Sequence, residues 1–267
     1  GGKGIAARLF HDPRWRNWFA ADVRLLGFFG RCGGDVCLMK VVLGSRSPQR
    51  RELMGWLVDE RDLLAVPPEC SDELSFHGLD RDDAIADQLG EIVQQKFDDV
   101  AGQVRNLPQP GGQQVCIVCA DTVVVAQSGD GKVVLGQPDE VGGEDQLRQW
   151  MADYLSGQAH EVWTCFQAGV PAESDRMPVR RETVKTTVWL EELTPQFVDW
   201  YISTGEYRGK AGGYAIQGLA SVFVRQVQGS LTNVIGLPLM ELHRALTTFG
   251  IPLRNGAGIW LRKDGDR

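Results

Sequence analysis

Hydrophobic positions along the chain change their spacing at regular intervals from about residue 39 onward. Val41–Leu43 and Val115–Ala120 are short, continuous apolar runs typical of buried strands, whereas Ile85, Leu89 and Ile92 recur at the spacing of one helix face. The pattern predicts strands at 40–44, 62–66, 115–120, 160–168, 183–190 and 221–227, a hairpin arm near 132–135, and helices at 48–58, 81–101, 143–155, 195–203 and 238–249. Such alternation predicts an α/β fold, with helices around a mixed sheet.

Two local signals refine this outline. Thr194 is suited to cap the helix at 195–203, and Pro195 suits its first position. The polar, irregular segment 169–182 is typical of an exposed hairpin loop.

The first 38 residues differ from the rest of the chain. Glycines at 27, 30, 33 and 34 interrupt any helix there, and the segment lacks the roughly 7–15 uninterrupted apolar residues of a secretory signal. No run approaches the ~20 apolar residues of a membrane span. We expect residues 1–38 to be a non-native or poorly ordered extension before a natural start at Met39, 39–255 to form one folded domain, and 256–267 to be a C-terminal tail.

Charge and cysteine content narrow the classes of partner. The chain has 267 residues and a formal net charge of -7, which argues against a general nucleic-acid or membrane-surface binder. A local basic site for a small polyanion is compatible with that charge. Among the six cysteines, Cys116 and Cys119 form a CxxC, but residues three apart on a strand point to opposite faces. We expect buried, reduced thiols and a cytoplasmic setting.

Residues 44–53 contain the most informative chemical signal. Ser47 is placed to cap a helix that begins at Pro48, and such a helix start favours acidic neighbours. The chain instead places Arg46, Arg50 and Arg51 there. Cations at a helix N-terminus indicate a bound anion, held by backbone N–H groups and guanidinium groups together. The pattern predicts a phosphate site, with solvated surface arginines as the alternative.

Carboxylates mark two further places. Asp121 interrupts an apolar run, and a buried charge is costly unless it is paired or binds a metal. We expect it at the end of a buried strand, as a metal ligand or general base; an aspartate that starts a turn is the alternative. Glu69, Asp72 and Glu73 form an acidic loop that could hold Mg²⁺ or could simply be solvated.

The glycine-rich segment 207–218 suggests close approach to a ligand. It carries Lys210 among glycines, and Gln217 can both donate and accept hydrogen bonds at a nucleobase edge. The chain has no GxxxxGK[ST] sequence, which counts against a P-loop NTPase. No Ser or Cys nucleophile motif accompanies His160, so we expect it to be a hydrogen-bonded structural histidine.

Taken in order, these segments resemble the Maf family, the septum-formation proteins related to inosine triphosphate pyrophosphatases. The resemblance runs from about Met39 to Phe249 and is carried by six segments: 43–53, 120–124, 156–164, 201–206, 210–218 and 233–239. It implies a mixed, strongly twisted sheet flanked by helices, with the nucleotide in a cleft between two lobes. It also implies a nucleoside triphosphate pyrophosphatase, which releases a monophosphate and pyrophosphate. A homodimer is common in the family.

The resemblance assigns roles residue by residue. Ser45, Arg50 and the helix start would hold phosphates, while Glu73 and Asp121 would bind Mg²⁺ or Mn²⁺. Asp121 would also accept the proton of the attacking water. Lys96 and Lys210 match two family lysines near the substrate.

Substrate choice within the family is tied to three positions, here Gln49, Thr122 and Gln217. Thr122, Gln217 and the segment 214–218 resemble the branch acting on dTTP and UTP, whereas Gln49 stands where that branch has arginine. Gln137 replaces a usual lysine. The alternatives are the same reaction on another base, such as 7-methyl-GTP, or a catalytically weak nucleotide-binding regulator linked to cell division.

Overall fold

The computed structural model describes residues 39–70, 74–105, 115–129, 131–138, 141–171, 179–251 and 254, together with the backbone of 31–32 and 35–36. The latter form a short antiparallel pair, β1 (Arg31–Cys32) with β2 (Asp35–Val36). The predictions for the remainder of segment 1–38 and for 256–267 lie outside the described residues.

Strands and helices alternate through the described domain, as the sequence pattern predicts. The strands are β3 (Lys40–Gly44), β4 (Leu63–Ala65), β5 (Val115–Ser128), β6 (Gly131–Leu135), β7 (Ala159–Gly169), β8 (Val179–Leu190) and β9 (Val224–Gln228). The α-helices are α3 (Pro48–Leu57), α4 (Asp82–Arg105), α5 (Gly143–Trp150), α6 (Pro195–Ser203), α7 (Leu231–Ile235) and α8 (Leu239–Thr248). Short 3₁₀ turns cover Glu60–Asp62, Ala211–Gly213 and Leu219–Phe223, and Met151–Leu155 is π-helical.

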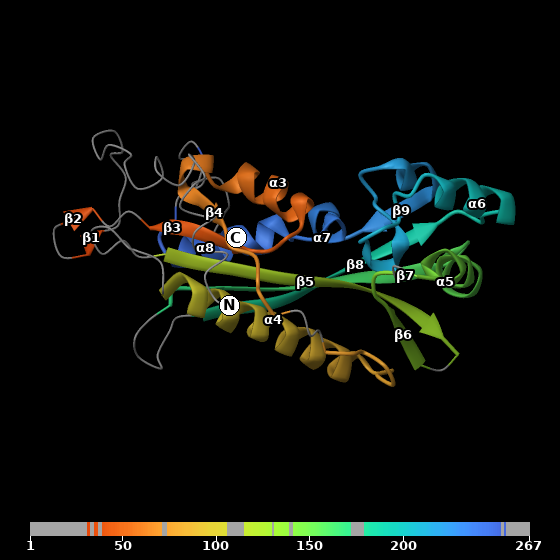
Figure 1. Ribbon diagram of the computed structural model, residues 1–267, viewed down its shortest axis with the longest axis horizontal. Helices are drawn as coiled ribbons and strands as arrows, with labels where there is room; N and C mark the ends of the chain where they lie inside the picture. Colours follow the sequence, from red (N-terminus) through yellow and green to blue (C-terminus); the bar gives the residue numbers. More distant parts are fainter. Residues whose placement is uncertain are drawn as a thin grey trace, which may run out of the picture.

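The seven strands form one open, mixed sheet. Its order is β4-β3-β5-β7-β8-β9, with β6 also paired to β5. The β3 strand is parallel to β4 and β5, whereas β5, β7, β8 and β9 are successively antiparallel and β6 is antiparallel to β5. The β5 strand runs along the long axis of the molecule and links its two ends (Figure 1). The α/β class and the mixed sheet flanked by helices are therefore confirmed.

One edge of β5 carries a notch. The β7 strand pairs with β5 from Ile117 to Ala126, and so occupies one edge. On the opposite edge, β3 pairs only as far as Cys119, and β6 begins only at Val124. Among the described residues, no strand therefore pairs with 120–123 on that edge. Because successive side chains of a strand point to opposite faces, both faces of the sheet open into this notch.

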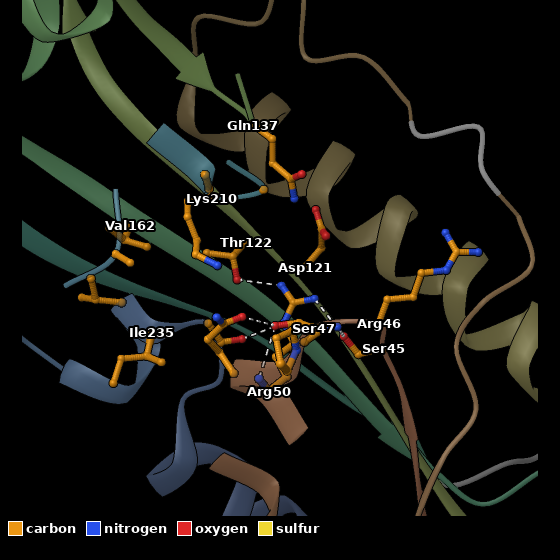
Figure 2. A pocket seen from close by; sticks show the side chains of 18 of the residues that line it. Ser45, Arg46, Ser47, Arg50, Asp121, Thr122, Gln137, Val162, Lys210 and Ile235 are labelled. Carbon is orange, nitrogen blue, oxygen red and sulfur yellow. Dashed lines mark hydrogen bonds between the residues drawn. The ribbon is translucent and has the colours of Figure 1, made fainter. Parts of the chain in front are cut away.

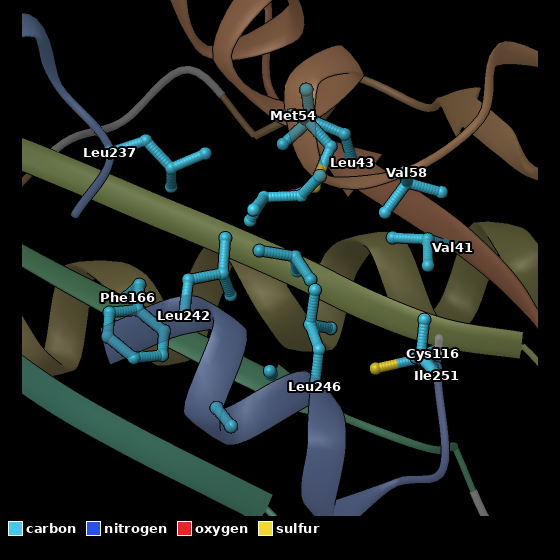
Figure 3. Packing of buried hydrophobic residues seen from close by; sticks show 14 of the residues in the cluster. Val41, Leu43, Met54, Val58, Cys116, Phe166, Leu237, Leu242, Leu246 and Ile251 are labelled. Carbon is cyan, nitrogen blue, oxygen red and sulfur yellow. The ribbon is translucent and has the colours of Figure 1, made fainter. Parts of the chain in front are cut away.

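Three hydrophobic clusters pack around the sheet. Against one face, α3 and α8 cover Leu43 and Phe166 (Figure 3). The long helix α4 covers the other face through residues such as Phe97. A third cluster, at the far end, packs β5, β7 and β8 against α5 and α6.

The two CxxC thiols separate as expected. Cys116 belongs to the α3–α8 cluster and Cys119 to the α4 cluster, and neither forms a disulfide. Burial raises the pKa of each thiol to about 12. Both cysteines therefore remain protonated and act as small hydrophobic residues.

Several predicted boundaries are wrong. The β5 strand does not end at Ala120 but continues to Ser128, because its second half pairs with both β6 and β7. Asp121 thus lies inside a strand, which also excludes the turn-starting alternative. The β8 strand begins at Val179, so the predicted loop at 169–182 is wrong at both ends, and 172–178 lie outside the described residues. The short helix α7 was not predicted.

Two predicted helix caps are confirmed. The Ser47 side chain accepts a hydrogen bond from the Arg50 backbone N–H at 3.3 Å, and Thr194 accepts one from Phe197 at 3.3 Å. Both helices have proline at the first position.

The end of β3 depends on a residue without a side chain. A Cβ atom at Gly44 would overlap the Cys119 sulfur and lie 2.9 Å from Val100 Cγ2. Gly44→Ala should therefore lower the free energy of unfolding by about 1–3 kcal/mol, measured by urea denaturation. Adding Cys119→Ala should restore part of the loss. Gly55→Ala, on α3 with open space around it, is the matched control and should not destabilise the protein.

Candidate active site

A pocket of about 510 Å³ lies at the notch in the sheet. It is lined by the β3–α3 turn, the middle of β5, the glycine-rich segment 208–217 and α7. Figure 2 shows Asp121 and Thr122 between the Arg50 side and the Lys210 side of this pocket. The described residues that the family resemblance singled out all line it: Ser45, Gln49, Arg50, Lys96, Asp121, Thr122, Gln137, Lys210 and Gln217. Glu69 of the predicted acidic loop is exposed and does not line the pocket, and Asp72 lies outside the described residues. Glu73 lies outside the described residues.

Asp121 and Thr122 reach the same pocket from opposite faces of β5. Asp121 points to the α4 side, where its Oδ1 accepts a hydrogen bond from Lys96 Nζ at 2.7 Å. The two side chains are 14% and 13% exposed, so this ion pair is mostly shielded from water. Pairing satisfies the charge that made Asp121 conspicuous in the sequence.

Groups from two distant segments and from the adjacent turn hold the Arg50 guanidinium. Its Nε donates to the Gly236 carbonyl at 2.9 Å, and a terminal nitrogen donates to Thr122 Oγ1 at 3.0 Å. The other terminal nitrogen lies 3.5 Å from Ser45 Oγ. Arg50 thus faces the pocket in a fixed orientation, whereas Arg51 is exposed and does not line the pocket.

Cationic side chains dominate the described lining of the pocket. Arg46, Arg50, Lys96, Arg208 and Lys210 line it, and Asp121 is the one acidic side chain among the described lining residues. This local excess of positive charge contrasts with the net charge of -7 for the whole chain. The pocket is therefore suited to a ligand with several negative charges.

Glycines position Lys210 at the pocket. Gly212 has a φ of 65°, and its N–H donates to the Gly136 carbonyl at 2.8 Å. A Cβ atom there would lie 2.7 Å from Val124 Cγ2, so only glycine allows this segment to approach β5 so closely. In Figure 2 the Lys210 side chain extends toward Thr122.

Part of the pocket wall is less polar. Figure 2 shows Val162 and Ile235 on the side away from Arg46, and Tyr214, Ala215 and the exposed Gln217 also line the pocket. This combination of apolar surface and an amide is suited to a nucleobase. The pocket thus places a cationic region and an apolar region within one cavity.

His160 contacts Tyr214 of this wall and does not itself line the pocket. It is 2% exposed, and its Nε2 lies 2.7 Å from the Tyr214 hydroxyl. Burial lowers the pKa of His160 to about 4. The prediction of a hydrogen-bonded structural histidine is confirmed.

Sequence reasoning missed several contributors. Arg208 lines the pocket and forms an ion pair with Glu144 at 3.6 Å; its proximity to Lys210 in the sequence was an available signal. The Gly236 carbonyl that holds Arg50 comes from 186 residues away, and no local pattern indicates such a contact.

An open α/β sheet with a cationic pocket at a break in strand pairing is suited to a ligand that carries phosphate groups. Residues 40–249 match the family described as Maf-like protein, and the chain belongs to that family. It is 35% identical over 219 residues to a dTTP/UTP pyrophosphatase of Cereibacter sphaeroides, covering 82% of this chain and all of the relative.

Two further relatives carry the same name. A dTTP/UTP pyrophosphatase of Anaeromyxobacter dehalogenans is 37% identical over 80% of this chain and 96% of its own length. One of Bartonella quintana is 31% identical over 91% of this chain and 98% of its own length.

The buried His160 predicts a pH dependence of stability. Its pKa falls from 6.5 to about 4 on folding, so the unfolded chain binds the proton first as pH decreases. The free energy of unfolding should therefore decrease by about 3 kcal/mol between pH 6.5 and pH 4 through this group. Urea denaturation across that range should show the slope in wild type and a smaller slope in His160→Gln. His77→Gln, at an exposed position, should retain the wild-type slope.

Proposed function

We propose that this protein is a nucleoside triphosphate pyrophosphatase acting on dTTP, UTP or modified pyrimidine nucleotides. The observation that carries the proposal is the pocket itself, where five cationic side chains surround one carboxylate beside an apolar wall. The names of relatives that align along nearly their full length support the same substrates.

In the proposed reaction, a water oxygen adds to the α-phosphorus while the bond to the α–β bridging oxygen breaks. Asp121 accepts the proton of that water, and pyrophosphate leaves. Lys96 occupies Oδ1 of Asp121, and Oδ2 has no hydrogen-bond partner among the described residues. The lysine thereby fixes the orientation of the carboxylate in the pocket. Ser45, Arg50 and Lys210 would hold the phosphates and stabilise their developing charge.

The donor set fits a hard divalent cation. Mg²⁺ is commonly held by one or two carboxylates together with substrate phosphates and water, and Asp121 offers such a carboxylate in the pocket. When bound, Mg²⁺ or Mn²⁺ would supply charge neutralisation at the phosphates. Glu73 would be a second ligand; Cys70, three residues before it, lines the pocket.

Two glutamines in this pocket stand where the resembled dTTP/UTP branch has cationic residues. Gln49 lines it at the start of α3 and accepts a hydrogen bond from the Ser47 hydroxyl at 3.1 Å, while Gln137 lies at the side of Lys210. Each offers an amide where the resembled branch has a cation. Loss of a charged hydrogen bond weakens binding by about 1.5–3 kcal/mol, so each glutamine should lower the affinity for a triphosphate relative to that branch.

The deciding experiment is pyrophosphate release from a panel of normal and modified nucleoside triphosphates, with Mg²⁺ or Mn²⁺ and with EDTA. Metal-dependent release that is fastest with dTTP or UTP is the expected result. Fastest release from 7-methyl-GTP would change the substrate and keep the reaction. No release from a folded protein would favour the nucleotide-binding regulator.

Asp121→Asn should reduce turnover by at least a thousandfold, because the amide cannot accept the proton of the attacking water. Its melting temperature should stay close to wild type, since the amide oxygen can still accept from Lys96. Asp62→Asn is a matched control: Asp62, in the 3₁₀ turn before β4, pairs with Lys40 of β3 at 2.6 Å but does not line the pocket. Its activity should equal wild type. Near-normal turnover in Asp121→Asn would remove this residue from the mechanism.

Gln49→Arg should increase kcat/KM for dTTP or UTP by about tenfold, because it adds a cation at the phosphate end of the pocket. Gln226→Arg adds the same charge at an exposed position on β9 and should leave kcat/KM unchanged. An equal rate for wild type and Gln49→Arg would show that the choice of base is made elsewhere.

A further inference from the structure

Two of the matching segments, 156–164 and 233–239, have side chains that the proposed reaction does not use. Thr164 on β7 and Asn233 on α7 are both completely buried, with 0% exposure. They come from positions 69 residues apart, yet Thr164 Oγ1 donates a hydrogen bond to the Asn233 carbonyl at 3.1 Å. A buried hydroxyl group needs such a partner for stability alone. The second contact of Thr164, however, is with a residue that lines the pocket.

The hydroxyl of Thr164 also lies 2.9 Å from Thr122 Oγ1. A threonine hydroxyl has one proton, and that of Thr164 goes to the Asn233 carbonyl. Thr122 must therefore donate to Thr164. In turn, Thr122 Oγ1 accepts from the Arg50 guanidinium at 3.0 Å, and a guanidinium can only donate. Every proton in this series has a fixed direction, from Arg50 through both hydroxyls to the carbonyl.

The series closes into a ring. The Asn233 carbonyl also accepts the Gly236 N–H at 3.0 Å, and the Gly236 carbonyl accepts from Arg50 Nε at 2.9 Å. Arg50 is thus bound at two of its nitrogens by one connected set of groups from β5, β7 and α7. The Asn233 side chain secures α7 in turn, through Nδ2 bonds to the Val162 carbonyl and Thr186 Oγ1.

We propose that Thr164 is a positioning residue, which acts through Thr122 to hold the Arg50 guanidinium toward the phosphates of the substrate. This inference rests on the proposed function. Thr164 itself does not line the pocket and has no direct route to a ligand. By fixing the proton of Thr122 away from Arg50, it keeps an oxygen lone pair of Thr122 directed at the guanidinium.

The role differs from a merely structural one in a measurable way. If Thr164 only stabilises the fold, its loss should change activity independently of Thr122. If it acts through Thr122, its loss should have no further kinetic effect once the Thr122 hydroxyl is gone. A double-mutant cycle measures this dependence directly.

The experiment compares wild type, Thr164→Val, Thr122→Val and the double variant by steady-state pyrophosphate release. Valine has nearly the shape of threonine without its hydroxyl, and the Asn233 carbonyl keeps its bond from Gly236. Thr164→Val should reduce kcat/KM five- to tenfold, mainly by raising KM. Thr122→Val should reduce it at least as much, and the double variant should match Thr122→Val within twofold. Thr164→Ser, which keeps the hydroxyl, should return kcat/KM to within twofold of wild type.

Thr186→Val is the matched control. Thr186 is equally buried at 1% exposure, and it bonds the Asn233 side chain without belonging to the ring. It should lower the melting temperature about as much as Thr164→Val while changing kcat/KM less than twofold. A wild-type kcat/KM in Thr164→Val, or fully multiplicative losses in the double variant, would overturn the inference.

A second readout separates this inference from the proposed function. Binding of inorganic pyrophosphate, measured by titration calorimetry, reports on the same cationic site without turnover. A wild type that binds pyrophosphate but releases none from nucleotides would contradict the proposed function, and the cycle of binding constants would still decide the role of Thr164. A wild type that does not bind pyrophosphate would overturn both.

Discussion

The site depends on a gap in strand pairing. One edge of β5 is covered by β3 up to Cys119 and by β6 from Val124, and no strand of the described part of the chain pairs with the residues between them on that edge. A strand normally sends neighbouring side chains into separate layers of a protein. At this gap the two layers join, so a carboxylate from one face and a hydroxyl from the other can act on one ligand.

Polar side chains inside a buried strand need hydrogen-bond partners, and in β5 these partners include cationic side chains. Asp121 is paired with Lys96 on the α4 face, and Thr122 accepts from Arg50 on the opposite face. The same contacts that remove the cost of burying these groups also orient two positive charges toward the pocket. The same contacts therefore both stabilise the central strand and position the cationic groups of the site.

Local sequence patterns predicted much of the fold, the arginines at the start of α3, Asp121 and the glycine-rich segment with Lys210. Ser45, Lys96 and Gln137 were identified only through the family resemblance. The apolar spacing located nearly all strands and helices, and capping chemistry identified the start of α3, because these signals lie within a few residues of one another. Register does not. The extension of β5 past Ala120 depends on pairing with β6 and β7, and the contacts of Arg50 with Gly236 and of Thr164 with Asn233 join distant segments. Such contacts leave no local pattern, which is why Asp121 was placed at a strand end and Thr164 was given no role.

The continuity of β5 also constrains how the cleft can move. Many two-lobed enzymes close over their ligands by bending a loop that connects the lobes. Here an unbroken 14-residue strand, paired to β7 across the whole gap, passes through the pocket. Such a strand has no loop about which to bend, so the width of the cleft can change only by twisting of the sheet or by movement of the surrounding segments. A ligand therefore meets central groups that are already in place, and its arrival need not assemble them.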